Sequence, residues 1–363
     1  MKKLVEGFEH QQGAHCGTTT FKDLLAFYGF QFSEPMIFGL ASGLWFYYWE
    51  RKKPPYPFIV GRTVDLEWTL CANLGIALME YTSPDSQAAW LAVKELNDNN
   101  IPIWINCDMH YLDHHAQSPH FGGHRVIVAG YDEEQGVAYL ADNAFPALQP
   151  CRLESLKEAR ASKHGPFLSE NAWFTLRCPT ALPPLEVMIK RGAQKTAITM
   201  LNPPNENSGL PGIRRFGREL AAWDKQYPPA QFPRAYEAVY QMIEEIGTGG
   251  ACFRNLWTGF LQGAIEHLDA HRRNAFASAA QIYTQTAMLW ERVARLIRQA
   301  TQDDVGGKLL REASQVLGQI ADQEEQALTS LLDGSLPDPP NLATSPAARP
   351  SFGCTLRRFH ERD

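Results

Sequence analysis

Residues 11–25, QQGAHCGTTTFKDLL, contain the first strong structural signal of the chain. The polar run that ends at Gly13 indicates a loop, and the apolar spacing after Thr20 indicates a helix that stops near Gly29. Cys16 therefore lies at or near a helix N-terminus. There the helix dipole and the backbone N–H groups favour a thiolate, and the same N–H groups can bind a developing oxyanion. An isolated cysteine is more often a small buried hydrophobe, but a loop-to-helix junction is an unusual place for a packing residue. The two interpretations, a nucleophile and a packing residue, are therefore about equally supported by this position.

A second stretch, residues 122–143 (GGHRVIVAGYDEEQGVAYLADN), predicts a hairpin of two strands around a polar turn. If the turn is centred near residues 133–134, His124 lies opposite Asp142 or Asn143. Side chains that face each other in a hairpin have Cβ atoms about 4.5–5.5 Å apart. A carboxylate there could hold one imidazole nitrogen and leave the other for a nucleophile, as the third member of a catalytic triad does. His124 alone would be an ordinary edge-strand histidine. With Cys16 and a carboxylate in the same half, a catalytic role is favoured. The register leaves Asp142 and Asn143 open, and we favour Asp142.

The composition excludes several functional classes. The chain has 363 residues, enough for two domains, with 34 basic and 40 acidic side chains and a formal net charge of −6. Neither half is strongly basic, so we expect no nucleic-acid partner. No run of about 18 apolar residues predicts a membrane span, and no secretory signal is evident, so we expect a cytoplasmic protein. The seven cysteines are odd in number and form no CxxC pair, which predicts reduced thiols and no structural zinc site.

The two halves differ in their periodicity. Strands are predicted at 101–106, 125–131 and 136–141 and a helix at 86–97, whereas the helices predicted after residue 183 lie at 234–246, 252–270, 273–300 and 307–333. The fold class is therefore α+β. We expect a catalytic domain at 1–180, a linker around 178–184, a mostly α-helical domain at 181–335 and a Pro-rich, flexible tail at 336–363.

The motifs HCGTTT, GGHRVIVAGYD and YLADN resemble the N-terminal domain of the butirosin biosynthesis protein H (BtrH) family. The segments at 209–223 (GLPGIRRFGRELAAW) and 247–264 (GTGGACFRNLWTGFLQGA) resemble the helical, DUF4872-like domain that commonly follows it. The resemblance covers roughly residues 8–335. It implies a papain-like (NlpC/P60-type) cysteine-enzyme fold and an acyltransferase, in which Cys16 is the nucleophile, His124 the base and Asp142 the orienting residue.

Further residues are candidates for the pocket. By the same resemblance, Gln11 or Gln12 could donate to an oxyanion, although both lie closer to Cys16 than is usual in papain-like peptidases; the backbone N–H of Cys16 is the better-supported donor. The other candidates for substrate contacts are His15, Glu34, Arg62, Asp108 and Asn143. His110 and His114 have the i, i+4 spacing of metal ligands on a helix. Their segment has no helical periodicity, so we expect a loop over the cleft and no metal.

Together with the candidate triad, the resemblance implies a cysteine-dependent acyltransferase of natural-product metabolism. By this resemblance it would move an acyl group from an acyl carrier protein, through an acyl-cysteine, to a small amine acceptor, and we expect no cofactor. The alternatives are an amidase or peptidase with the same triad and a catalytically silent module that binds a carrier protein or a peptide. Arg214 and Arg218 share one helix face and are a candidate docking surface for an acidic carrier protein, or else a solvated face. The sequence identifies neither the acyl group, the amine nor the oligomeric state.

Overall fold

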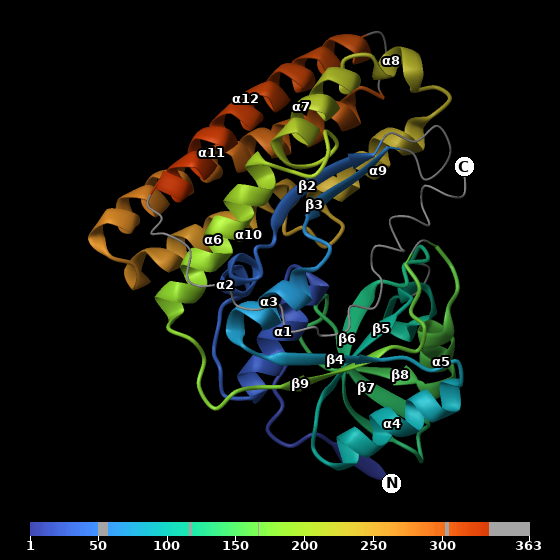
Figure 1. Ribbon diagram of the computed structural model, residues 1–363. Helices are drawn as coiled ribbons and strands as arrows, with labels where there is room; N and C mark the ends of the chain where they lie inside the picture. Colours follow the sequence, from blue (N-terminus) through green and yellow to red (C-terminus); the bar gives the residue numbers. More distant parts are fainter. Residues whose placement is uncertain (50–56, 116–117, 166, 302–304, 334–363) are drawn as a thin grey trace. The chain divides into compact units, whose positions relative to one another are not determined.

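The computed structural model describes residues 1–49, 57–115, 118–165, 167–301 and 305–333 (Figure 1). The predicted tail at 336–363 lies outside the described residues. The described chain forms two compact units. Of the described residues, the first unit comprises Met1–Gln31 and Leu78–Arg177, and the second comprises Phe32–Ala77 and the chain from Cys178 to Asp333. A sheet with helices is present in the N-terminal half and helices predominate in the C-terminal half, so the α+β class is confirmed.

A seven-stranded sheet organises the first unit. Its strands follow the order β4-β9-β5-β6-β7-β8, and β1 pairs with β6. Their bounds are β1 (Lys2–Leu4), β4 (Ala77–Tyr81), β5 (Ile103–Cys107), β6 (His124–Asp132), β7 (Val137–Ala141), β8 (Gln149–Arg152) and β9 (Trp173–Arg177). The nine-residue β6 is paired antiparallel with β5, β7 and β1, and it is therefore the central strand of the sheet.

Helices cover both faces of this sheet. Helices α4 (Ser86–Asp98) and α5 (Leu153–Ala161) pack on one face, where Ile105, Val126 and Leu140 are completely buried. Trp104 alternates with Ile105 and so points to the opposite face. There it packs edge-on against Phe21 of α1 (Cys16–Phe27), with ring centroids 5.6 Å apart. This contact packs α1 against the sheet.

The pairing of β6 with β7 corrects the predicted register. Asp132 pairs with Val137 at the turn and Ile127 with Ala141, with a β-bulge between Val128 and Gly130. The turn is therefore centred later than predicted, and His124 does not lie directly opposite Asp142. Continuing the pairing beyond Ala141 places Asp142 opposite Val126, which is two residues from His124 on the same face. Asp142 and His124 are diagonal neighbours.

Gly130 makes the bulge compatible with the neighbouring strand. Its φ is +153°, and a Cβ at this position would lie 2.4 Å from the carbonyl oxygen of Lys3 in β1. Only glycine allows so close an approach between the two backbones.

The second unit is mostly helical, as predicted for the C-terminal half (Figure 1). Its elements are α2 (Glu34–Leu40), β2 (Leu44–Trp49), β3 (Phe58–Arg62), α3 (Leu66–Leu74), α6 (Leu185–Leu201), α7 (Gly209–Leu220), α8 (Trp223–Gln226), α9 (Pro233–Glu244), α10 (Arg254–Ala264), α11 (Ala270–Gln299) and α12 (Gly306–Asp333). The short turns are η1 (Met109–Tyr111) and η2 (Asp113–His115) in the first unit, and η3 (Ala251–Phe253) and η4 (Ile265–His267) in the second.

The segment Phe32–Ala77 lies in the second unit, which differs from the continuous division expected at residue 180. Close packing explains this: a Cβ on Gly192 of α6 would lie 2.4 Å from the carbonyl oxygen of Gly39 in α2. The aromatic ring of Phe46 in β2 packs 5.5 Å from that of Trp290 in α11. An N-terminal segment thus completes the core of the helical unit.

A buried ion pair lies within this helical core. Nε and Nη2 of Arg254 each lie 2.9 Å from a carboxylate oxygen of Glu324, and both side chains are completely buried. Trp290 donates its indole N–H to the same carboxylate at 3.1 Å.

Two further findings concern predictions from composition. No helix of the described part of the chain is long and apolar enough to span a membrane. None of the six cysteines within the described ranges takes part in a disulfide, whereas Cys354 lies outside those ranges.

Candidate active site

Cys16 is the first residue of α1, as the sequence predicts. The helix is capped by His15, whose Nδ1 accepts a hydrogen bond from the backbone N–H of Thr18 at 3.2 Å. His15 is buried, so its observed role is that of a helix cap. Cys16 is partly exposed. Since the first N–H groups of a helix have no partner inside it, the start of α1 is suited to stabilising negative charge.

His124 and Asp142 meet at one end of the sheet. His124 is the first residue of β6, and Asp142 directly follows β7. Nε2 of His124 lies 2.7 Å from Oδ2 of Asp142, and both side chains are buried. The side chain of Cys16 is hydrogen-bonded to His124. Because Nε2 is engaged by Asp142, Nδ1 is the ring nitrogen that remains for Cys16. Cys16, His124 and Asp142, which are distant in sequence, are thus connected by consecutive hydrogen bonds.

His124 and Asp142 each shift the pKa of the other toward its charged form. Burial alone would lower the pKa of His124, but the charge of Asp142 and the hydrogen bonds to Asp142 and Cys16 outweigh burial and raise the pKa to about 10. Burial alone would raise the pKa of Asp142, but the charge of His124 and hydrogen bonds from three histidines hold the pKa of this carboxyl well below its usual range. An imidazolium next to Cys16 favours the thiolate, which is the nucleophilic form of cysteine.

The loop before Cys16 is tied to the loop that carries Asp142. Nδ1 of His10 lies 2.6 Å from Oδ2 of Asp23 in α1, and both side chains are 3% exposed. Nε2 of the same histidine lies 3.1 Å from the backbone oxygen of Asp142 and 2.9 Å from that of Phe145. His10 therefore bridges α1 and the loop after β7. Sequence reasoning missed it because no spacing signal links residues 13 and 132 positions apart.

Asn143 and Gln12 strengthen the same connection. The backbone oxygen of Asn143 accepts from the N–H of Gly13 at 3.0 Å, and its side-chain amide donates back to the oxygen of Gly13 at 3.3 Å. The amide nitrogen of Gln12 donates to the backbone oxygen of Ala144 at 2.8 Å. Gln11 is exposed, and its backbone oxygen accepts from Lys22 at 3.2 Å. The contacts of these residues are those of loop anchors.

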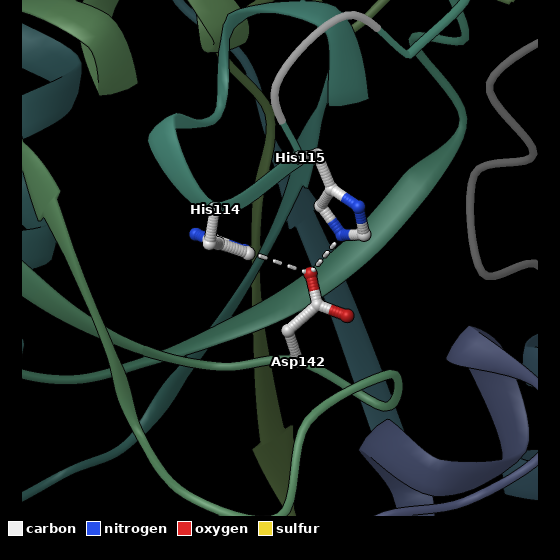
Figure 2. Close-up of side chains that lie close together, drawn as sticks. All are labelled: His114, His115 and Asp142. Carbon is white, nitrogen blue, oxygen red and sulfur yellow. Dashed lines mark hydrogen bonds and ion pairs between the residues drawn. The ribbon is translucent and has the colours of Figure 1, made fainter.

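Two histidines of the segment predicted to form a loop over the cleft also contact Asp142, a contact that the sequence did not predict. His114 and His115 belong to η2. Their Nε2 atoms lie 3.1 Å and 2.9 Å from Oδ2 of Asp142. Figure 2 shows both rings directed at the same carboxylate oxygen. The expected non-helical loop is present here as two short 3₁₀ turns. The contact could not be deduced from spacing, because it joins residues 27 and 28 positions apart.

Asp108 lies in the interior of the same unit. Its side chain is completely buried and bonded to Nδ1 of His120 at 2.9 Å and to Oγ of Ser162 at 2.6 Å. It also accepts from the backbone N–H groups of His110 and Phe121. Asp108 therefore anchors the histidine-rich loop in the structure. Glu34 and Arg62, the remaining predicted pocket residues, belong to the second unit.

The predicted docking arginines are also in the second unit. Arg214 forms ion pairs with Asp322 and Glu325 of α12. Arg218 is exposed, and within the described ranges it forms no ion pair. Of the two arginines, Arg218 is therefore the one whose charge is available to a partner.

The fold and the site together define a class: α+β proteins with a cysteine–histidine–aspartate constellation at the start of a helix. Residues 15–143, which include all three members, match the family model described as butirosin biosynthesis protein H, N-terminal. Residues 154–331 match the domain of unknown function DUF4872. The chain thus belongs to the BtrH-like family, with a BtrH N-terminal domain followed by a DUF4872 domain. No curated protein matches the chain.

Proposed function

We propose that this chain is a cysteine-dependent acyltransferase that takes an acyl group from a carrier-protein thioester and forms an amide with a small amine. One observation carries the proposal: Cys16 begins a helix and is hydrogen-bonded to His124, whose Nε2 is held by Asp142. The same arrangement supports a papain-like fold for the first unit. The family description, butirosin biosynthesis, supports a role in natural-product metabolism.

The first half-reaction transfers the acyl group to the enzyme. The Cys16 thiolate attacks the thioester carbonyl carbon, and N–H groups at the start of α1 stabilise the oxyanion. When the tetrahedral intermediate collapses, the carbon–sulfur bond to the phosphopantetheine arm breaks. The imidazolium of His124 gives its proton to this leaving sulfur, so that a neutral histidine faces the acyl-enzyme.

The second half-reaction forms the amide. A neutral amine attacks the acyl carbonyl, and His124 removes the proton that the nitrogen must lose. The Cys16 thiolate is then expelled, and the imidazolium–thiolate pair is restored. Asp142 holds the imidazole in the required orientation and stabilises its positive charge throughout. The chemistry needs no cofactor.

The test is a trapping experiment with the full-length chain. The protein is mixed with an acyl thioester, its intact mass is measured, and the acyl-enzyme is then divided between an amine solution and buffer. An acyl-transferase forms a covalent adduct that the amine discharges faster than water does. An adduct discharged equally fast in buffer would indicate an amidase or peptidase. Absence of any adduct with carrier-bound and small thioesters would indicate a silent binding module.

The partner in this proposal is an acidic carrier protein. Its docking would use the exposed Arg218 on α7, whereas Arg214 is engaged by α12. Charge complementarity at such a surface mainly increases the rate of encounter, and salt weakens it.

A further inference from the structure

Asp142 has more imidazole partners than the proposed catalysis uses. Orienting His124 requires one hydrogen bond, yet His114 and His115 also direct their Nε2 atoms at the same oxygen (Figure 2). Asp142 is completely buried, and the side chains of His114 and His115 are 6% and 11% exposed. These two histidines form a cluster with Asp142 for which the acyl-transfer steps provide no role.

The cluster is held in place from several sides. Asp113, the first residue of η2, is bonded to the guanidinium of Arg152 at 2.9 Å and to Oγ of Ser155 at 2.8 Å. The ring of Phe145 packs edge-on against those of His114 and His115, at centroid distances of 5.2 and 5.4 Å. The two imidazoles therefore have a fixed orientation before any ligand binds, which reduces the entropic cost of binding.

The donor set and its dimensions fit a zinc ion. Two imidazole nitrogens and one carboxylate oxygen are a common zinc ligand set, which leaves one further coordination position. Ligand atoms about 2.0–2.1 Å from a tetrahedral zinc ion lie about 3.3–3.4 Å apart. The two nitrogen–oxygen distances here are 3.1 and 2.9 Å, and all three ligand atoms lie within 4.8 Å of one another. In the zinc-bound form the two imidazole nitrogens and the carboxylate oxygen would adjust until they lie about 3.3–3.4 Å apart.

We propose that His114, His115 and Asp142 form a zinc-binding site and that zinc bound there inhibits the enzyme by withdrawing Asp142 from His124. Zinc would occupy Oδ2, the oxygen that holds Nε2 of His124. The other oxygen, Oδ1, already accepts from the backbone N–H of Ala144 at 3.2 Å. In the structure each Nε2 donates to the Asp142 carboxylate, so zinc binding requires both imidazoles to move the Nε2 proton to Nδ1 or to solvent and to present the Nε2 lone pair to the metal. The binding site stands on its own geometry, and its inhibitory effect rests on the proposed function.

Isothermal titration calorimetry of the metal-stripped full-length chain with ZnCl₂ tests the site without any activity measurement. We expect one zinc ion per chain with a Kd of about 10 μM or lower. The variant His114→Gln/His115→Gln keeps polar side chains that can donate to Asp142 but removes both imidazoles. Since losing a residue that merely supports a ligand weakens metal binding about 10–100-fold, we expect the loss of two ligands to weaken it at least about 100-fold. Wild-type protein that binds no zinc at these concentrations would overturn the proposal.

Two matched variants locate the metal. His267→Gln/His271→Gln changes two exposed histidines of the second unit. Cys16→Ser removes the thiol, which is the other zinc ligand expected near His124. Zinc binding should be unchanged in both. The Co²⁺-substituted protein should show visible bands without an intense thiolate-to-cobalt band in the near ultraviolet. Loss of binding in either variant, or a thiolate band, would place the metal elsewhere and refute the site.

The inhibitory effect is measured separately. If the chain transfers acyl groups, zinc should inhibit the wild type, and the ratio of activities with and without zinc should approach one in His114→Gln/His115→Gln. Zinc binding at the cluster without inhibition would refute the link to catalysis. A protein that binds zinc there but has no acyl-transfer activity would refute the proposed function and confirm the metal site.

Discussion

Nε2 of His124 lies 2.7 Å from Oδ2 of Asp142, although the two residues are not directly opposed in their hairpin. They are diagonal neighbours, because the pairing continued beyond Ala141 places Asp142 opposite Val126. Asp142 therefore holds Nε2 of His124, and Nδ1 is left for Cys16.

The first prediction concerns the nucleophile. Cys16→Ala should abolish the acyl adduct, because no other described thiol lies at a helix N-terminus beside His124. Intact-mass spectrometry after incubation with an acyl thioester measures this. The fold should be retained, since Cys16 is partly exposed, and circular dichroism provides the control. An adduct of undiminished yield on the folded variant would assign the chemistry to another residue.

The second prediction distinguishes Asp142 from Asn143. Asp142→Asn removes the charge that supports the imidazolium, so kcat should fall about 10²–10⁴-fold. Asn143→Ala removes only a side-chain bond to Gly13, and the backbone bond remains, so its effect on kcat should be much smaller. Single-turnover kinetics with the same thioester compare the two variants. The reverse order of effects would show that the observed hydrogen bond is not the one used in catalysis.

The third prediction concerns the stability of the helical unit. Glu324→Ala leaves the buried charge of Arg254 without its partner and should lower the free energy of unfolding by about 3–5 kcal/mol. The double variant Arg254→Met/Glu324→Leu removes both charges and should recover much of this loss. Urea denaturation measures each value.

A pair on the surface provides the control for this prediction. Arg292 of α11 and Glu312 of α12 form an ion pair whose side chains are 49% and 36% exposed. Glu312→Ala should therefore change the free energy of unfolding by less than about 1 kcal/mol. Equal effects of Glu324→Ala and Glu312→Ala would mean that burial does not determine the contribution of these pairs.

The fourth prediction concerns the carrier protein. Arg218→Glu should raise the KM for a carrier-bound thioester and reduce its sensitivity to salt, because an exposed attractive charge is replaced by a repulsive one. Turnover of a small free thioester, which requires no docking, is the internal control and should be unchanged. If both donors are affected equally, Arg218 supports the fold and not a docking surface.

The sequence alone determined the local elements of this protein and its family. The loop signal at Gly13 and the apolar periodicity placed a helix start at or near Cys16 and long helices at α11 and α12, because this periodicity comes from residues three or four positions apart on one helix face. The motifs around Cys16 and His124 identified the BtrH-like family. The sequence left Asp142 and Asn143 open as the partner of His124, with a preference for Asp142.

Only the tertiary structure decided which distant segments meet. The bulge before Gly130 and a later turn changed the hairpin register, and a backbone irregularity of this kind has no reliable signal in the side-chain pattern. Close packing of Gly39 against Gly192 assigned residues 32–77 to the helical unit. The convergence of His114 and His115 on Asp142 depends on where η2 is held relative to the end of β7. Such contacts are set by the packing of the whole unit, so local spacing does not encode them.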